Sequence, residues 1–76
     1  MPSSYVLVDV ESGSEDFVYN QIKNILDVRE AYVTFGMYDL IARVSAGTMD
    51  ELKAVVCKIR LVDKIISTLT LMMIEE

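Results

Sequence analysis

The same order of apolar, polar and helical patterns occurs twice in this chain of 76 residues. Each half has an alternating apolar segment, a break of small residues, a segment with apolar residues at helical spacing, a short charged link and a second apolar segment. Two strand–helix–strand units with right-handed crossovers, joined by a hairpin, predict the βαββαβ order of the split βαβ, or ferredoxin-like, architecture. We therefore expect one α+β domain over residues 1–76, with a four-stranded antiparallel sheet and two helices on one face.

Local signals assign four strands and two helices to this order. β-branched and aromatic residues with a period of two indicate the strands. A hydroxyl followed by carboxylates in the first turn indicates the start of each helix, and Thr48 with Glu51 forms a capping box. The links 27–30 and 61–64 are expected to occupy equivalent places in the two halves. The expected strands are 5–11, 31–36, 38–45 and 65–74, and the expected helices run from Ser14 to about Leu26 and from Thr48 to about Arg60.

The two periodicities also predict which side chains form the core. The expected helix-facing side chains of the strands are Val6, Val8, Val10, Leu40, Ala42, Val44, Leu69, Leu71 and Met73, with Ala31, Val33 and Phe35 preferred over Tyr32 and Thr34. The expected stripes of the helices are Val18, Ile22, Ile25 and Leu26, with Tyr19 beside them, and Leu52, Val55, Val56 and Ile59. The open face of the sheet would then carry Tyr5, Leu7, Asp9, Ile41, Arg43, Thr68, Thr70 and Met72. Such a face is too apolar for water alone and predicts an interface, within which Asp9 and Arg43 would pair.

The composition favours self-association. A domain of this length buries only roughly 60% of its unfolded surface, yet 53% of its residues are hydrophobic. One cysteine excludes a disulfide within the chain, and the lack of histidine disfavours zinc-type sites. We therefore expect no metal and no cofactor, and oligomerisation is the remaining way to stabilise so small a domain.

Charge and hydropathy limit the partners. The net charge is −5, and the seven Lys and Arg residues are dispersed, which argues against direct binding of nucleic acid. No segment has the ~20 uninterrupted apolar residues that cross a bilayer, so we expect no membrane partner. The amino terminus lacks the basic flank of a signal peptide, and the single Cys57 fits a reducing compartment, so we expect a cytoplasmic protein.

Residues 31–44 contain two apolar segments that are separated by residues typical of turns. The simple interpretation of Gly36-Met37-Tyr38-Asp39 is a hairpin turn between the two central strands. A small-ligand loop is the second interpretation, because glycine lets a ligand approach the backbone and the following amides can receive a carboxylate. Short hydroxyls that would suit a zwitterionic ligand at a subunit boundary come from Thr34, Ser67, Thr68 and Thr70.

The sequence offers few groups for catalysis. There is no histidine, phosphate loop or nucleophile elbow, so we expect no enzyme and no catalytic residue. The alternatives to a ligand-binding module are a purely structural assembly module and, less favoured, a small enzyme of the dimeric α+β barrel type. A deep pocket that holds a carboxylate with a raised pKa would favour the enzyme.

Residues 31–44 closely resemble the central motif of the amino-acid-sensing (RAM) domain of leucine-responsive, Lrp/AsnC-type transcription regulators. The shared pattern is an apolar strand, a Gly-x-Tyr-Asp turn and a second apolar strand. The resemblance extends to the helix start Met49-Asp50-Glu51-Leu52 and to Ser67-Thr68-Leu69-Thr70 in the last strand. It implies a ferredoxin-like fold that dimerises through its sheet as a dimeric α+β barrel. It also implies that dimers assemble into octamers or similar rings, with amino acids or related small effectors bound between dimers.

In full-length members of that family a helix-turn-helix precedes this domain, and no such segment occurs in these 76 residues. The chain therefore looks like a stand-alone sensing domain. It would modulate transcription or metabolism only indirectly, through a partner such as a full-length regulator of the same family. Phe35 stands where relatives often have a smaller residue, which would change the size of the pocket. The positions that match the family's ligand site are Thr34, Gly36, Met37, Tyr38, Asp39, Thr68 and Thr70.

Overall fold

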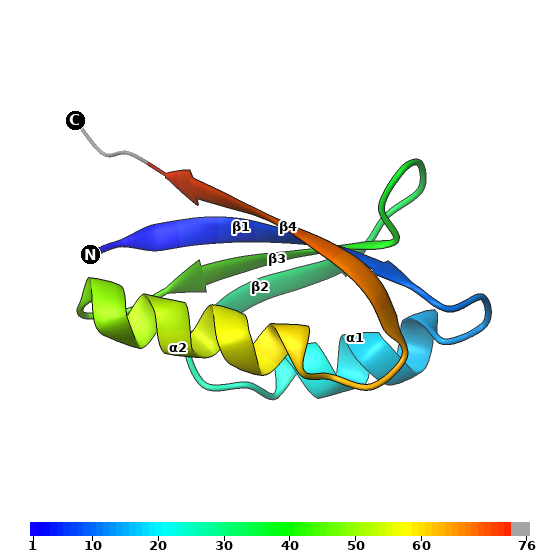
Figure 1. Cartoon of the computed structure of the whole chain (residues 1–76), viewed down its shortest axis with the longest axis horizontal. Coiled ribbons are helices and arrows are strands. Elements are labelled where there is room, and N and C mark those ends of the chain that lie inside the picture. Colours follow the sequence, from blue (N-terminus) through cyan, green and yellow to red (C-terminus); the bar gives the residue numbers. More distant parts are fainter. Residues whose placement is uncertain (74–76) are drawn as a thin grey trace.

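The structure, a computed structural model, describes residues 1–73 and has the expected βαββαβ order. A four-stranded antiparallel sheet carries two helices on one face, and the ferredoxin-like prediction is confirmed (Figure 1). The elements are β1 (Ser3–Val10), α1 (Glu15–Lys23), β2 (Val28–Val33), β3 (Leu40–Ser45), α2 (Met49–Arg60) and β4 (Ile65–Met73). The expected end of the last strand at Ile74, and the terminal Glu75 and Glu76, lie outside the described residues. Among residues 1–73, no helix is long and apolar enough to cross a membrane.

The strand order is β2-β3-β1-β4, so β1 lies in the interior of the sheet and β4 at an edge. Paired residues of antiparallel strands share a face of the sheet. One row on the face away from the helices therefore crosses all four strands, through Tyr32, Ile41, Leu7 and Leu69. We call the face that carries this row the open face.

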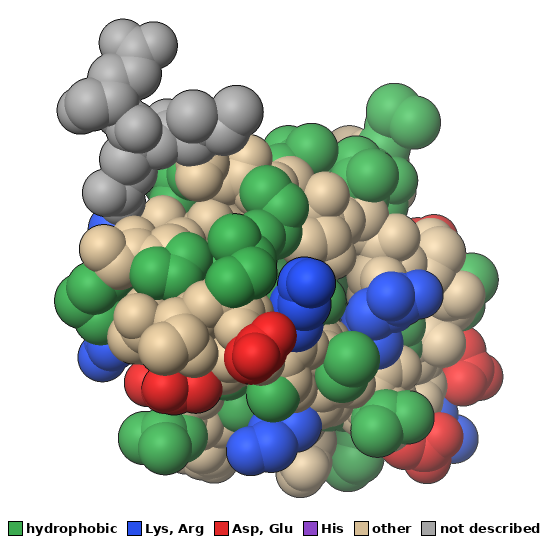
Figure 2. All heavy atoms as spheres, turned by 60° about the vertical axis from the view of Figure 1, so that its left-hand side comes forward, with side chains coloured by type: hydrophobic (Ala, Val, Ile, Leu, Met, Phe, Trp, Pro, Cys, Tyr) green, Lys and Arg blue, Asp and Glu red, His purple; other side chains and the backbone are tan. Residues whose placement is uncertain are grey.

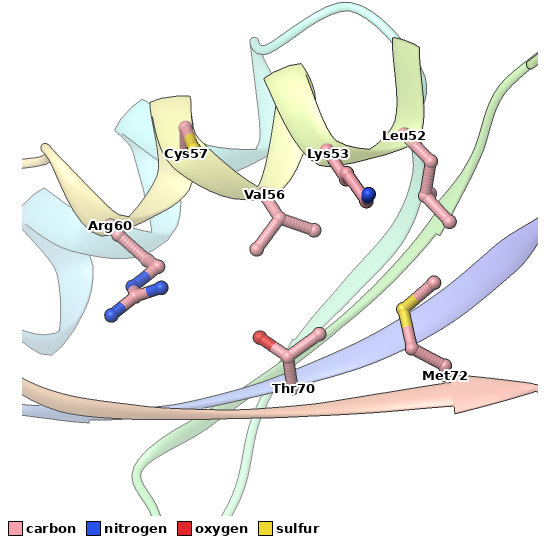
Figure 3. Close-up of a pocket in the computed structure, with 7 residues that line it drawn as sticks. All are labelled: Leu52, Lys53, Val56, Cys57, Arg60, Thr70 and Met72. Atoms are coloured by element: carbon pink, nitrogen blue, oxygen red, sulfur yellow. The ribbon is translucent and has the colours of Figure 1, made fainter. Parts of the chain in front are cut away.

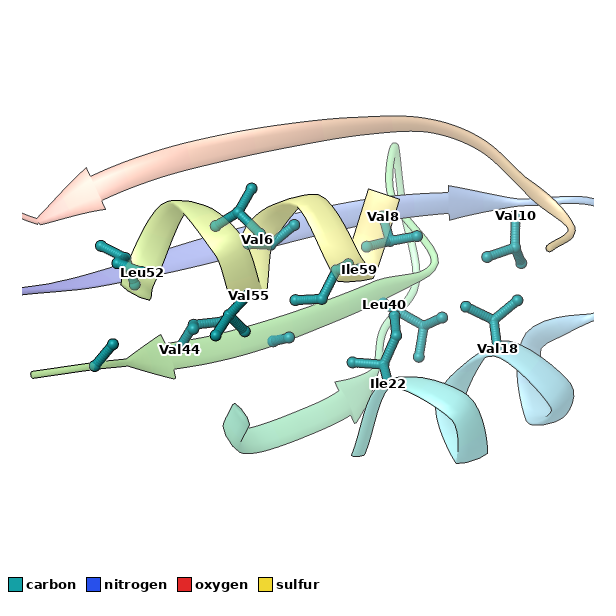
Figure 4. Close-up of a cluster of buried hydrophobic side chains, with 13 residues drawn as sticks. Val6, Val8, Val10, Val18, Ile22, Leu40, Val44, Leu52, Val55 and Ile59 are labelled. Atoms are coloured by element: carbon teal, nitrogen blue, oxygen red, sulfur yellow. The ribbon is translucent and has the colours of Figure 1, made fainter. Parts of the chain in front are cut away.

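The core lies between the sheet and the two helices (Figure 4). Every second residue of β1 and β3 is buried there, as the alternation predicts. The helices contribute apolar residues at helical spacing, which confirms the expected stripe of α2 in full and that of α1 in part. The buried hydrophobic residues are Val6, Val8, Val10, Val18, Ile22, Leu40, Ala42, Val44, Ala46, Leu52, Val55, Val56 and Ile59.

The prediction of which side chains of the last strand face the helices is wrong: the two faces are reversed. Val6 pairs with Thr70 and Leu7 with Leu69, so Thr70 faces the helices and Leu69 faces away from them. The reason is a bulge at the start of β4, where Asp9 pairs with Ser67 but Val10 pairs with Ile65. The extra residue lets Ile65 pack against the core and reverses the facing of the residues that follow. Thr68, Thr70 and Met72 therefore face the helices, and Leu69, Leu71 and Met73 belong to the open face.

The ends of the helices also differ from the expected ones. Helix α1 stops at Lys23, and Leu26, expected in the core, is 79% exposed. The links that occupy equivalent places are 24–27 and 61–64, because each ends on a residue of positive φ, Asp27 (75°) and Lys64 (73°). Both residues lie at the point where the chain leaves the helix layer and enters the sheet.

The two predicted helix caps have different outcomes. The Thr48 hydroxyl accepts a hydrogen bond from the backbone amide of Glu51 at 3.2 Å, and it donates one to the Glu51 carboxylate at 3.3 Å. Ser14 occupies the N-cap position of α1, but its side chain makes no capping bond. The Glu15 carboxylate instead accepts the amide of Gly13 at 3.4 Å.

Candidate functional site

The Gly-x-Tyr-Asp motif lies in a loop that extends beyond the end of the sheet (Figure 1). The expected strands reached 36 and restarted at 38, but β2 ends at Val33 and β3 begins at Leu40. The hairpin interpretation is confirmed, with a six-residue loop in place of a tight turn. We call residues 34–39 the hairpin loop.

Thr34 closes the base of the hairpin loop. Its amide donates to the Asp39 carbonyl at 2.8 Å, and its hydroxyl donates to the Tyr38 carbonyl at 2.8 Å. The backbone bond continues the pairing of β2 with β3 by one position beyond the Val33–Leu40 pair, and the hydroxyl bond closes the loop above it. The threonine hydroxyl, proposed for a ligand, is thus already used to hold the loop.

The apex of the hairpin loop is open and apolar. Gly36 has φ +124°, a conformation that residues with a Cβ rarely adopt. Met37 is 88% exposed, and Phe35, expected against the helices, is fully exposed. Phe35 lies beyond the end of β2, so strand alternation no longer determines its direction. Ala31, nearer the strand centre, does pack against the core.

Asp39 attaches the hairpin loop to β1. Its carboxylate accepts the amide of Val10 at 2.9 Å, and its own amide donates to the Val8 carbonyl at 2.9 Å. These bonds continue the pairing of β3 with β1 beyond the Val8–Leu40 pair. The side-chain bond spans 29 positions of sequence, so local turn chemistry could not have predicted it.

Asp9 lies beside Asp39, and the two carboxyl groups interact. A hydrogen bond to Asp39 raises the pKa of Asp9, and partial burial and repulsion by the Asp39 charge act in the same direction. The Val10 amide and then the Asp9 carboxyl lower the pKa of Asp39. The predicted Asp9–Arg43 pair is wrong, because Arg43 is registered with Tyr5, roughly 13 Å along the strand from Asp9.

Thr68 and Thr70 lie apart from the hairpin loop within one chain. Thr68 is registered with Val8 and Leu40, two strand spacings, or roughly 10 Å, from β3. Both threonines face the helices, whereas Asp39 contacts Asp9 on the open face. One chain therefore brings together five of the seven predicted ligand residues, Thr34, Gly36, Met37, Tyr38 and Asp39, and leaves two elsewhere.

A groove between α2 and β4 was not predicted from the sequence. Figure 3 shows Lys53, Val56 and Arg60 extending from α2 towards β4, where Thr70 and Met72 extend towards the helix. Its volume is about 360 Å³. The signal that could have identified it is the helical spacing of residues 53, 56, 57 and 60, a second stripe beside the core stripe. The residues that line it are Leu52, Lys53, Val56, Cys57, Arg60, Thr70 and Met72.

Groups for metal binding or catalysis are sparse in the described chain. Residues 1–73 contain no cluster of three acidic, cysteine or histidine side chains that could hold a metal ion. Asp9 has a raised pKa, but no carboxylate lines the α2–β4 groove or the neighbouring hollow around Arg60. On the side shown in Figure 2, Lys and Arg are interspersed with apolar and acidic side chains.

Comparisons with known proteins agree with the ferredoxin-like fold described above. The family model of the Lrp/AsnC ligand binding domain matches residues 3–76. A hypothetical protein from Pyrococcus horikoshii is 34% identical, with a TM-score of 0.90 over 100% of this chain and 93% of that one. No curated protein sequence matches the chain.

Longer regulators contain the same fold in part of their length. AsnC of E. coli is 26% identical, with a TM-score of 0.88 over 99% of this chain and 52% of its own. A feast or famine regulatory protein from M. tuberculosis, complexed with L-methionine, is 17% identical with a TM-score of 0.79. The match covers 100% of this chain and 52% of that protein. At 17% identity it is evidence for the shared fold alone.

Proposed function

The chain belongs to the Lrp/AsnC ligand-binding domain family, and on that premise we propose that it senses an amino acid at the hairpin loop and assembles through the open face of its sheet. The observation that carries the proposal is the loop itself. It presents a positive-φ glycine and exposed apolar side chains at its apex, on a base fixed by hydrogen bonds. Residues 1–76 act as one effector-binding and oligomerisation domain, and the proposed setting is the cytoplasm, where Cys57 stays reduced.

Different residues of the hairpin loop hold its base and form the ligand contact. Thr34 and Asp39 hold its base, because both use their side chains in bonds to the backbone. Gly36 and Met37 form its apex, where a ligand meets the backbone and an adaptable apolar side chain. The M. tuberculosis relative, whose structure holds L-methionine, supports an amino acid as the ligand class.

A second subunit completes the site. The loop extends beyond the end of the sheet and offers one wall, while Thr68 and Thr70 lie too far away to form the opposite wall in the same chain. The open face carries the apolar row Tyr32, Ile41, Leu7 and Leu69, and a contiguous apolar row of this kind favours dimerisation. Dimers then assemble into a ring of the octamer type, with the loops at the contacts between dimers.

The mechanism is a shift of assembly. An amino acid that contacts two dimers at once binds only the assembled state, so it stabilises that state by its differential affinity. Any effect on transcription or metabolism is indirect and acts through a partner, such as a full-length regulator of the same family. The second candidate is an assembly module without an effector, which the apolar row alone would support.

The test is a thermal-shift screen of all the common amino acids, repeated on loop variants. We expect at least one amino acid to raise the unfolding temperature, because a ligand of the native state stabilises it by mass action. Met37→Ala should weaken the response without lowering the basal stability, since its side chain is 88% exposed.

Leu26→Ala is the matched control, an exposed apolar side chain in the turn between α1 and β2. It should leave the response unchanged. If both variants reduce the response equally, the loop is not the site. If no amino acid stabilises the chain, the assembly module without an effector stands.

A further inference from the structure

The groove between α2 and β4 has an apolar floor. Its floor is formed by Leu52 and Val56, which are buried, and by Met72, which is half exposed at 46%. The volume of about 360 Å³ lies in the range of small-molecule sites, roughly 300–1,000 Å³. The groove opens on the helix side of the sheet, away from the open face proposed for assembly.

Two cations flank this apolar floor. Lys53 and Arg60 come from the same side of α2, two turns apart, and both extend towards the groove (Figure 3). Arg60 also borders an adjoining hollow with the hydroxyl-bearing residues Ser67 and Thr68. The groove thus has a basic end that continues into a polar hollow, and a second cation along its length.

No carboxylate competes for these cations within the described chain. Neither hollow is lined by an acidic residue. The nearby Glu51 carboxylate accepts the Thr48 hydroxyl, and Asp63 accepts the amide of Lys64 at 3.0 Å. The one ion pair found among residues 1–73 joins Arg29 and Asp27 at 3.6 Å, outside this region. The net charge of the chain is −5. Two cations without acidic partners beside an apolar groove therefore favour an anionic ligand over a cationic one.

We propose that the α2–β4 groove binds an organic acid with an apolar body, its carboxylate at Arg60 and its hydrocarbon along Val56 and Met72. The guanidinium offers paired donors that match a carboxylate. Thr68 provides a hydroxyl beside it, and Lys53 adds a second positive charge. This site is separate from the hairpin loop and does not depend on the function proposed for that loop.

Octanoate is the probe, and methionine methyl groups are the reporters. The chain has five methionines, of which Met72 lines the groove and Met37 lies in the hairpin loop. In a chain labelled with [¹³C-methyl]methionine, we expect octanoate to shift the Met72 resonance saturably and to leave the Met37 resonance in place. Octylamine, which has the same hydrocarbon and the opposite charge, should shift Met72 at least tenfold more weakly.

Three glutamine variants test the charges. Lys53→Gln and Arg60→Gln should each raise the half-saturating octanoate concentration about threefold, as expected for exposed ion pairs. Lys58→Gln is the matched control, since it removes the same charge from α2 at a residue that does not line the groove. All three positions are exposed, so each variant should fold.

Several results would overturn the proposal. A Met72 resonance that ignores octanoate, or that responds equally to octylamine, would exclude an acid-selective site. An equal rise of the half-saturating octanoate concentration in Lys58→Gln would attribute the effect to the net charge of the chain and not to the groove.

Discussion

The Asp9 and Asp39 carboxyl groups make the base of the hairpin loop sensitive to pH. The folded state raises the pKa of Asp9, so its contribution to stability is complete below the unfolded value of 3.8 and is lost as pH rises through the folded value. The pKa of Asp39 is lowered, so its contribution is present above 3.8 and is lost as pH falls through its folded value. The two carboxyl groups therefore act on stability with opposite signs.

Asp9→Asn should stabilise the chain at neutral pH and have no effect at about pH 3. The amide keeps a donor towards Asp39 and removes the repulsion that raises the pKa of Asp9. Chemical denaturation measured between about pH 3 and pH 7 checks this. Glu11→Gln removes one charge at the exposed end of the same strand and serves as the control for net charge. Equal stabilisation by both substitutions would attribute the effect to the charge of −5.

Gly36 is a residue whose backbone conformation, and not its surroundings, restricts substitution. A Cβ at Gly36 would meet nothing within 4 Å, but φ is +124°. Gly36→Ala should therefore lower the free energy of unfolding by about 1–2 kcal/mol through strain alone. Gly47→Ala is the control, because its Cβ would make only ordinary contacts at 3.7 Å with Glu51. Denaturant titration of both variants measures the difference, and equal losses would contradict the strain argument.

At the scale of elements, the two helix-to-sheet links share one device. Asp27 and Lys64 both have positive φ at the last residue before a strand. An L-residue in that conformation costs roughly 1–2 kcal/mol, part of which glycine recovers. Lys64→Gly should raise the free energy of unfolding by about 0.5–1 kcal/mol. Lys64→Ala removes the same side chain and keeps the strain, so it should give no such gain. Thermal unfolding of the two variants separates these outcomes.

The elements differ in how well the sequence predicted them, for physical reasons. Strands β1 and β3 alternate strictly and are buried on one face, so their facing was predicted correctly. Strand β4 was predicted in reverse, because one bulge near Ile65 changes the facing of the residues after it and alternation cannot reveal a bulge. Helix α1 was predicted too long, because Ile25 packs against the core from the turn and extends the apolar period past Lys23.

The candidate site was predictable only in part. The Gly-x-Tyr-Asp motif identified the hairpin loop, but not that the Asp39 carboxylate accepts the Val10 amide from a distant strand. Thr68 and Thr70 were assigned to the same site by resemblance, whereas register puts them two strands away on the helix side. Sequence proximity to a motif therefore predicts local geometry well, and contacts that depend on register or on a second chain poorly.

At the scale of the whole molecule, the open face should determine the assembly state. Leu69 is 42% exposed and ends the apolar row that Leu7, Ile41 and Tyr32 continue across the sheet. In a two-fold interface each substitution occurs twice, so Leu69→Lys would bury two unpaired charges. We expect the wild type to be a dimer or larger ring at micromolar concentration and Leu69→Lys to sediment as a folded monomer.

Leu61→Lys provides the matched comparison for this test. Leu61 is 83% exposed in the turn after α2, on the helix side of the sheet, so its replacement should leave the sedimenting mass unchanged. Circular dichroism of both variants verifies that each remains folded. A wild type that sediments as a monomer, or a Leu69→Lys variant that keeps the wild-type mass, would show that the open face does not hold the assembly together. Loss of assembly in Leu61→Lys alone would instead locate the contact on the helix side, next to the α2–β4 groove.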